Sequence, residues 1–265
     1  MDSAERGVSK VRADQLLVSQ GLAESRTRAQ ALILAGNVFV GERRVGKAGD
    51  MLPEEASLTV KGRDHPWVSR GGIKLDHGLT HFGFDVAGAV ALDVGSSTGG
   101  FTDVLLSRGA KCVYAVDVGT NQLAWKLRSD ERVIVHEQTN ARDLSLEIVP
   151  EPVDIVVCDA SFIALHKVLD AALELARPGA MLVALIKPQF EAGRDEVGKG
   201  GVVRDPDVHR RVCDEAVAWV QSKRWRVLGV EPSPITGPEG NVEFLLAAIK
   251  EPTGDEAPGN LCAGG

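Results

Sequence analysis

The stretch from Ala89 to Asp103 constrains the fold of this chain more than any other. A short apolar run, Ala89 to Val94, is partly β-branched and ends at Gly95, which is typical of a buried parallel strand. The glycines at 95, 99 and 100 form a loop, and an apolar pattern of helical period follows from Phe101. Glycine permits positive φ and lets a ligand approach the main chain closely. We therefore predict a strand, a ligand-binding loop and a helix.

The loop sequence, Gly-Ser-Ser-Thr-Gly-Gly, narrows the class of ligand. It is not the Gly-x-Gly-x-x-Gly of a dinucleotide site, and no Lys-Ser/Thr follows it as in a phosphate loop. Asp93 and Asp103 flank it with carboxylates, which disfavour a pyrophosphate. A cationic, adenosine-bearing ligand fits better, so S-adenosylmethionine is the expected cofactor.

Strands and helices alternate beyond the loop, which predicts an α/β fold with a doubly wound parallel sheet. The expected strands cover residues 111–118, 133–137, 153–158 and 181–186, and a helix covers 206–223. Open α/β sheets bind ligands at the carboxyl ends of their strands, and a carboxylate about 20 residues past the glycine loop suits ribose hydroxyls. The predicted cofactor site comprises Asp93, Gly95, Ser97, Gly99, Gly100, Phe101, Asp117 (ribose), Asn140 (adenine edge) and Asp159.

The last two expected strands, residues 227–230 and 242–249, are joined by a Pro- and Gly-rich link without a helical crossover. Such a connection predicts an antiparallel pair. An antiparallel last strand begins where its parallel neighbours end, so we expect Glu243 at the same edge as Asp159 and Lys187. The tail, residues 251–265, is rich in Pro and Gly and is predicted to be disordered.

The first segment, residues 9–61, forms a separate small α+β unit in this interpretation. Its first helix runs from about Val11 and ends at Gly21, and Ser25 is placed to cap a second helix over residues 26–35. Short strands are expected at 38–40, 44–45 and 57–60. Residues 62–68 are predicted to form a linker to a larger domain over residues 69–250.

Basic residues are distributed unevenly along the chain. Residues 1–62 hold nine Lys/Arg and eight Asp/Glu, a net charge of +1, whereas the whole chain has a net charge of −7. Guanidinium groups at helix starts and turns are well placed for phosphates, although a solvated charged face would show the same pattern. The candidate RNA contacts are Arg12, Arg26, Arg28, Arg43 and Arg44.

Several classes of protein are disfavoured. No apolar run approaches the roughly 20 residues of a membrane span, and the first residues lack the apolar core of a signal peptide. The four cysteines have no C-x-x-C spacing, so we expect reduced thiols, a cytoplasmic protein and no cysteine metal site. His77 and His81 have the i, i+4 spacing of metal ligands, but no third ligand is evident and no metal is expected.

Two resemblances to known families follow from these motifs. The stretch V-R-A-D-Q-L-L-V-S-Q-G-L-A-E-S-R-T-R-A-Q-A-L-I-L-A-G-N-V-F-V-G resembles the S4 RNA-binding domain, with Val40-Gly41 where Val-Asn-Gly is usual. The whole of residues 9–250 resembles the TlyA-type rRNA methyltransferases, historically called hemolysins, whose catalytic domain is FtsJ-like. The resemblance rests on V-S-R-G-G-I-K-L, D-V-G-S-S-T-G-G-F-T-D, K-P-Q-F-E-A-G-R and S-P-I-T-G-P-E-G-N-V-E-F.

The resemblance implies a Rossmann-like sheet, S-adenosylmethionine as donor and the 2′-hydroxyl of cytidine in ribosomal RNA as acceptor. It also implies ribosomal RNA or ribosomal subunits as partners. The family's Lys-Asp-Lys-Glu tetrad corresponds to Lys74, Asp159, Lys187 and Glu243. Lys187 would either deprotonate the hydroxyl or stabilise the alkoxide that develops on it. The alternatives are a non-catalytic rRNA-binding assembly factor and, with least support, a pore-forming hemolysin.

Overall fold

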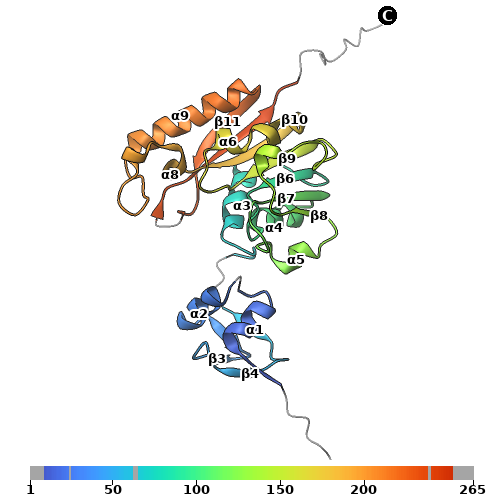
Figure 1. Cartoon of the computed structure of the whole chain (residues 1–265), viewed down its shortest axis with the longest axis vertical. Coiled ribbons are helices and arrows are strands. Elements are labelled where there is room, and N and C mark those ends of the chain that lie inside the picture. The colour runs from blue at the N-terminus through green and yellow to red at the C-terminus, as the bar shows by residue number, and fades with distance from the viewer. Residues whose placement is uncertain (1–8, 24, 62–64, 238–239, 253–265) are drawn as a thin grey trace, which may run out of the picture. The chain divides into compact units, whose positions relative to one another are not determined.

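The computed structural model describes residues 9–23, 25–61, 65–237 and 240–252 (Figure 1). The chain folds as two compact units that, apart from Ala124–Lys126, which group with the first, divide between Pro66 and Trp67, and each unit is described by itself. Residues 62–64 of the predicted linker, and most of the predicted disordered tail, residues 253–265, lie outside the described residues.

The smaller unit contains two helices and two small antiparallel sheets. Its elements are β1 (Lys10–Arg12), α1 (Ala13–Ser19), α2 (Arg26–Leu34), β2 (Val38–Val40), β3 (Arg43–Arg44), β4 (Met51–Pro53) and β5 (Leu58–Val60). The sheets have the orders β1-β4 and β3-β2-β5. Ser25 caps α2 as predicted, because its Oγ accepts a hydrogen bond from the Arg28 N–H at 3.2 Å. Leu17 of α1 and Ile33 of α2 are fully buried in its core.

The start of this unit differs from the sequence-based prediction. The sequence predicts Val11 in the first helix, but this residue lies in β1, opposite Leu52 of β4, and the helix begins at Ala13. Neither β1 nor β4 is predicted from the sequence. Each is three residues long, and their pairing joins segments about 40 residues apart, so no local period indicates them.

The larger unit is built on one seven-stranded sheet. Its strands are β6 (Val90–Val94), β7 (Cys112–Val116), β8 (Val133–His136), β9 (Val153–Cys158), β10 (Ala176–Ile186), β11 (Trp225–Pro232) and β12 (Phe244–Lys250). The strand order is β11-β12-β10-β9-β6-β7-β8. Strands β10, β9, β6, β7 and β8 are parallel, and β12 is antiparallel to both of its neighbours. The predicted α/β class and antiparallel last strand are therefore confirmed.

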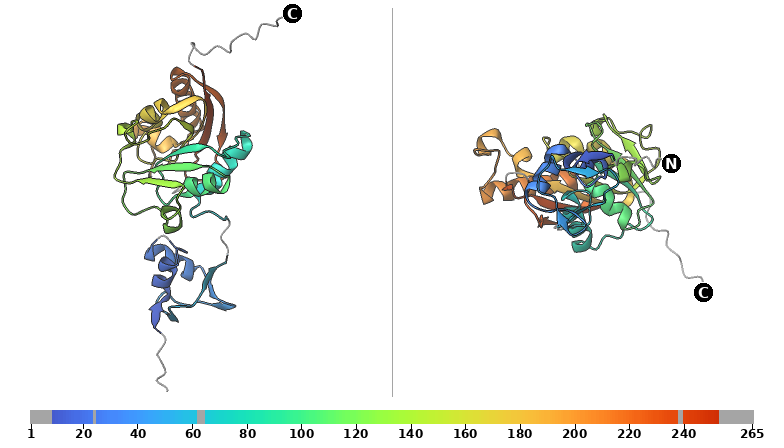
Figure 2. Two further views of the ribbon diagram at one scale, coloured as in Figure 1. Left: turned by 90° about the vertical axis from the view of Figure 1, so that its right-hand side faces the viewer. Right: turned by 90° about the horizontal axis from the view of Figure 1, so that it is seen from below.

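Helices cover both faces of this sheet (Figure 2). They are α3 (Gly71–His81), α4 (Gly100–Ser107), α5 (Trp125–Arg128), α6 (Leu165–Val168), α7 (Asp170–Glu174), α8 (Pro188–Glu191) and α9 (Pro206–Ser222), with 3-10 turns at Ala141–Asp143 and Arg194–Glu196. Helices α3 and α4 pack together on one face, and α9 packs against the strands and α6 on the other. The buried residues of α9 recur every four positions, from Val208 to Val220, which is why this segment is helical.

The sheet topology fixes where a ligand can bind. Strand order reverses between β6 and β9, which are parallel neighbours, and such a switch point opens a crevice at the carboxyl ends of the strands. Strand β10 begins at Ala176, earlier than predicted, and its pairing with β9 is irregular between Ala176 and Met181. Within the described part of the chain, no helix combines the length and apolar character needed to cross a membrane.

Candidate active site

Two adjoining cavities lie at the carboxyl ends of the central strands. The first has a volume of about 560 Å³ and the second about 530 Å³. Both are lined by Gly95 and Ser97 from the loop after β6, and by Asp159, Ser161 and Phe162 from the loop after β9. The two cavities therefore meet where β6 and β9 lie side by side.

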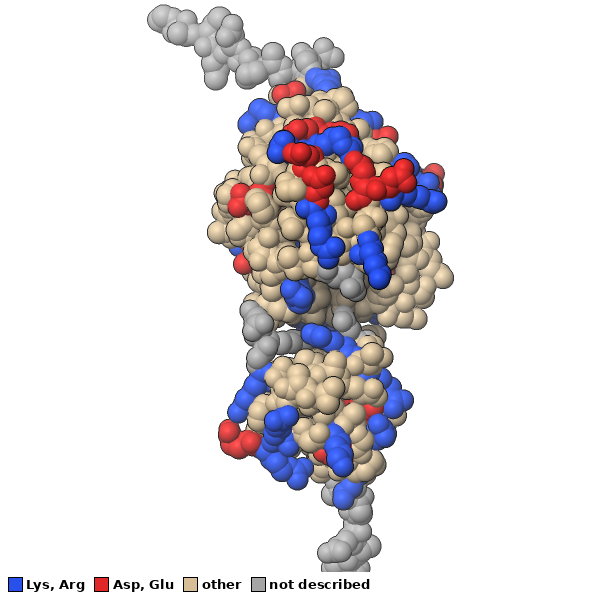
Figure 3. All heavy atoms as spheres, turned by 90° about the vertical axis from the view of Figure 1, so that its left-hand side faces the viewer, with Lys and Arg blue, Asp and Glu red and all other residues tan. Residues whose placement is uncertain are grey.

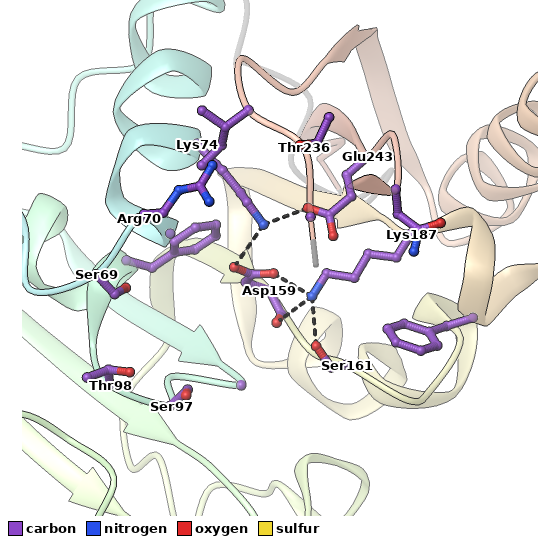
Figure 4. Close-up of a pocket in the computed structure, with 18 of the residues that line it drawn as sticks. Ser69, Arg70, Lys74, Ser97, Thr98, Asp159, Ser161, Lys187, Thr236 and Glu243 are labelled. Atoms are coloured by element: carbon purple, nitrogen blue, oxygen red, sulfur yellow. Dashed lines mark hydrogen bonds and ion pairs between the residues drawn. The ribbon is translucent and has the colours of Figure 1, made fainter. Parts of the chain in front are cut away.

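Four charged side chains from four elements converge in the first cavity (Figure 4). Lys74 lies on α3, Asp159 follows β9, Lys187 follows β10, and Glu243 precedes β12. The Lys74 Nζ is 2.6 Å from Glu243 Oε2 and 3.7 Å from Asp159 Oδ2. The Lys187 Nζ is 2.6 Å from Asp159 Oδ1. Asp159 therefore links the two lysines, and the cluster has no net formal charge.

The burial of these charges explains why they occur as pairs. The residues Lys74, Lys187 and Glu243 are only 7%, 6% and 1% exposed. An isolated charge so far from water would cost several kcal/mol, whereas a hydrogen-bonded partner of opposite sign offsets much of that cost. The antiparallel direction of β12 brings the fourth residue, Glu243, to the site. Phe244 is in register with Ile186, so Glu243 lies beside Lys187 at the sheet edge.

Ser161 belongs to this cluster, although the sequence does not single it out. Its Oγ accepts a hydrogen bond from Lys187 Nζ at 2.9 Å, and the Asp159 carbonyl oxygen accepts another at 3.1 Å. With the Asp159 carboxylate, three acceptors surround the amine, which matches the three donors of an ammonium group. In the sequence, Ser161 could have been found only from its position two residues after Asp159, in the same loop at the end of the strand.

The second cavity is lined by Asp117 and Asn140, as well as the shared residues. Asp117 Oδ2 accepts a hydrogen bond from the Ser97 N–H at 2.8 Å, and its Oδ1 accepts one from the Gly119 N–H at 2.7 Å. The carboxylate thus fixes the glycine loop beside the cavity. Ser97 itself has a φ of 46°, an uncommon value for a non-glycine residue that is often found at binding sites.

Gly95 is required by the close approach of two loops. Its φ is +79°, and a Cβ at this position would lie 2.9 Å from the Cα of Ala160. A side chain here would therefore collide with main chain rather than with a movable group. Gly100 is similarly restricted, since its Cβ would lie 2.9 Å from the Gly72 nitrogen. These glycines bring α3 and the β9 loop up to the loop that separates the cavities.

The structure divides the predicted cofactor residues into three groups. The second cavity is lined by Gly95, Ser97, Asp117, Asn140 and Asp159, whereas Gly100 and Phe101 line only the first. Asp93 and Gly99 line neither. Asp93 is completely buried in β6, where its Oδ2 accepts a hydrogen bond from Thr102 Oγ1 at 2.6 Å, and burial raises its pKa to about 7. Gly99 has a φ of +96° at the start of α4.

The second cavity fits the expected cofactor. Asp117 and Asp159 contribute carboxylates, which suit ribose hydroxyls and a cationic sulfonium group, and the loop exposes main chain without bulky side chains. Asp159 lies at the junction, so a group held between the cavities would be adjacent to both lysines.

In the smaller unit, the predicted RNA contacts differ in their surroundings. Asp14 is fully buried, and its carboxylate accepts hydrogen bonds from Arg12 Nη2 at 2.9 Å and Arg26 Nη2 at 3.3 Å. These two arginines therefore also stabilise the fold. Arg28, Arg43 and Arg44 are exposed. Lys and Arg side chains are spread over the face of this unit seen in Figure 3, with few acidic ones among them.

The structure brings a third potential ligand to the histidine pair. No third ligand is evident near His77 and His81 in the sequence, but Glu231 of β11 lies close to both. The Glu231 Oε2 is 3.8 Å from His81 Nε2. The sequence could not show this proximity, because about 150 residues separate Glu231 from the helix that carries the histidines.

The chain is similar to known families over most of its length. The model of the FtsJ-like methyltransferase family matches residues 67–250, and that of the S4 domain matches residues 11–58. Over 238 residues the chain is 47% identical to the 16S/23S rRNA (cytidine-2′-O)-methyltransferase TlyA of Mycobacterium tuberculosis, covering 89% of each chain. It is 48% identical to a provisionally named rRNA methyltransferase, YqxC, of Bacillus subtilis, covering 89% of this chain and 85% of that one.

A solved structure has a similar fold. A provisionally named hemolysin from Streptococcus thermophilus superposes with a TM-score of 0.73 and 41% sequence identity. The match covers 93% of this chain and 90% of the other.

Proposed function

Because the chain belongs to the FtsJ-like methyltransferase family and carries an S4 domain, we propose that it methylates the ribose 2′-hydroxyl of cytidine in ribosomal RNA. The buried cluster of Lys74, Asp159, Lys187 and Glu243 at the junction of the two cavities carries this proposal. The M. tuberculosis relative supports the nature of the acceptor. S-adenosylmethionine, when bound, supplies an electrophilic methyl group.

In this proposal the first cavity receives the target nucleotide and the second receives the donor. Asp117 would bind the donor's ribose hydroxyls, and Asn140 would contact the adenine edge. Asp159 lies between the cavities, and it holds Lys187 at the point where the acceptor oxygen must arrive. The transfer needs the acceptor oxygen to be aimed along the line of the bond being broken, so fixed positions matter more than new covalent chemistry.

Lys187 acts on the acceptor oxygen. Its amine has three acceptors around it, an arrangement that suits the ammonium form. In that form it stabilises the negative charge that develops on the ribose oxygen, and the low-dielectric surroundings strengthen this effect. Lys74 and Glu243 hold Asp159 in position. Lys74 contacts both carboxylates, and it pairs with the Asp159 oxygen that Lys187 does not contact.

The smaller unit would bind ribosomal RNA through its exposed arginines. Arg28, Arg43 and Arg44 are candidates for direct phosphate contacts, because their guanidinium groups are exposed. Recognition by an S4 domain would depend on shape and phosphates, so we propose structured rRNA within a ribosomal subunit as the partner.

The proposal is tested by measuring labelled-methyl transfer to undermethylated ribosomal subunits and mapping the modified nucleotides. Lys187→Ala is expected to bind S-adenosylmethionine normally in calorimetry but to transfer methyl groups about a hundredfold more slowly. Lys111→Ala, at an exposed lysine, is the matched control and should retain wild-type turnover.

Two further measurements separate the alternatives. Lys187→Arg retains a positive charge but cannot act as a base, so partial activity supports charge stabilisation and complete loss supports proton abstraction. A wild-type protein that binds rRNA but transfers no methyl group would contradict the proposal and favour an assembly factor. Leakage of vesicles at the concentrations used for methylation would instead favour a pore-forming protein.

A further inference from the structure

We propose that His77, His81 and Glu231 form a binding site for a zinc-like divalent cation. One ring nitrogen of each histidine and one carboxylate oxygen lie within 4.8 Å of one another. Two imidazoles and a carboxylate are a ligand set that Zn²⁺ accepts, with water filling the remaining position. None of the three residues lines either cavity of the candidate active site.

The two histidines are arranged for a shared ligand by the helix itself. Residues four apart in an α-helix lie on the same face, one above the other, so both imidazoles of α3 point to one side. Their ring centroids are 5.8 Å apart and the planes are tilted by 32°. The rings are therefore close enough for one nitrogen of each to reach a shared ion.

Glu231 brings the third ligand from a different element. It lies in β11, and its Oε2 is 3.8 Å from His81 Nε2. Metal–ligand bonds of about 2.0–2.2 Å in a tetrahedral site place neighbouring ligand atoms roughly 3.3 Å apart. The separation of Glu231 from His81 therefore exceeds that of a coordinated pair by only about half an ångström. The three ligand atoms lie within 4.8 Å of one another, so coordination requires the side chains to rotate towards a common point.

The state of His77 favours a ligand over a simple ion pair. Its Nε2 is buried and has no hydrogen-bond partner among the described residues. A pair between His81 and Glu231 alone would not use His77, and an exposed pair of this kind contributes little, since the two side chains are 43% and 35% exposed. A bound cation would involve all three residues.

The cation would join α3 to the edge of the sheet. Strand β11 pairs only with β12 among the described strands, so its outer edge has no neighbouring strand there. Helix α3 carries Lys74 one turn before His77, and β12 follows Glu243. We therefore assign the site a structural role: it clamps the edge strand to the helix that carries one of the buried lysines.

Calorimetric titration of the untagged, chelator-treated full chain with ZnCl₂ tests the site. We expect one ion per chain, at least thirtyfold weaker binding in His81→Ala and in His77→Ala, and a smaller loss in Glu231→Gln. His166→Ala removes an exposed histidine elsewhere and should bind zinc like the wild type. Zinc should also raise the Tm of the wild type and not that of His81→Ala.

His81 is partly exposed, so its replacement keeps the test decisive even where His77→Ala fails to fold. Zinc affinity unchanged in His81→Ala would show that the ion binds elsewhere, for example at a cysteine, and would overturn the proposal. Absence of saturable binding to the folded wild type would overturn it too. Neither result depends on methyl transfer, so the proposed function is tested separately.

Discussion

At the scale of single residues, Asp117 holds the glycine loop in place and also lines the second cavity. Its two carboxylate oxygens each accept a main-chain hydrogen bond, from Ser97 and from Gly119, and it also lines the second cavity. Each oxygen retains further acceptor capacity, which a ribose hydroxyl can use. The residue therefore shapes the glycine loop and lines the cavity that we propose for the donor.

Asp117→Ala is expected to weaken S-adenosylmethionine binding at least tenfold, because it removes the ribose acceptor and releases the Ser97 N–H. Calorimetry of the two proteins measures the difference. Asp195→Ala, at an exposed carboxylate, is the control. Equal donor affinity in Asp117→Ala and wild type would remove this residue from the donor site.

The raised pKa of Asp93 predicts how the stability of the fold depends on pH. Burial raises its pKa to about 7 from the ordinary value of 3.8, so between about pH 4 and pH 7 the folded chain binds more protons at this site than the unfolded chain. The contribution of Asp93 to the free energy of unfolding should therefore fall as pH rises through this window. In urea unfolding, the free energy of the wild type should fall relative to that of Asp93→Asn across that range. Parallel profiles for the two proteins would argue against a raised pKa at Asp93.

At the scale of elements, the approach of the loops after β6 and β9 creates the junction between the cavities. Gly95 allows this approach through its positive φ and its lack of a side chain. Gly88 offers a matched comparison, since its φ is +73° but a Cβ there would meet no atom within 4 Å. A side chain would be strained by the positive φ at both positions, but it would collide with a neighbouring atom only at Gly95.

Gly95→Ala should therefore lose more than Gly88→Ala. We expect both to be destabilised by about 1 kcal/mol through backbone strain, and Gly95→Ala to lose a further 1–3 kcal/mol together with most of its donor affinity. Chemical denaturation and calorimetry measure the two effects. Similar behaviour of the two variants would mean that the contact with Ala160 relaxes without consequence.

At the scale of the whole molecule, the chain combines a small basic unit with a larger acidic one. Residues 1–62 have a net charge of +1 and residues 63–265 have a net charge of −8, which together give the total of −7. Binding to RNA should therefore depend on a limited set of arginines rather than on overall charge.

Replacing both Arg28 and Arg43 with Glu is expected to weaken rRNA binding and to reduce the dependence of log affinity on log salt by about one for each phosphate that the protein no longer neutralises. Donor binding should be unchanged. The control replaces Arg177 and Arg210 with Glu, which changes net charge equally at exposed positions of the larger unit. Equal weakening in the two double variants would indicate a general charge effect instead of a defined contact.

Local sequence determined the elements that have a clear apolar period and clear start or stop residues. The apolar run before Gly95, the amphipathic segment after Pro206 and the Ser25 cap all have local physical causes, and the structure contains each of them. The link without a helical crossover before residue 242 was enough to predict the antiparallel last strand. The tetrad assignment depends on a family resemblance, because spacing alone does not single out Lys74.

Tertiary structure alone decided which side chains meet. The pairing of β1 with β4, the contact of Ser161 with Lys187 and the approach of Glu231 to His81 depend on how distant segments pack. The buried environment that raises the pKa of Asp93 likewise arises only when the sheet and α4 enclose it. Periodicity records which face of an element is apolar, whereas distances between elements are set by packing of the whole core.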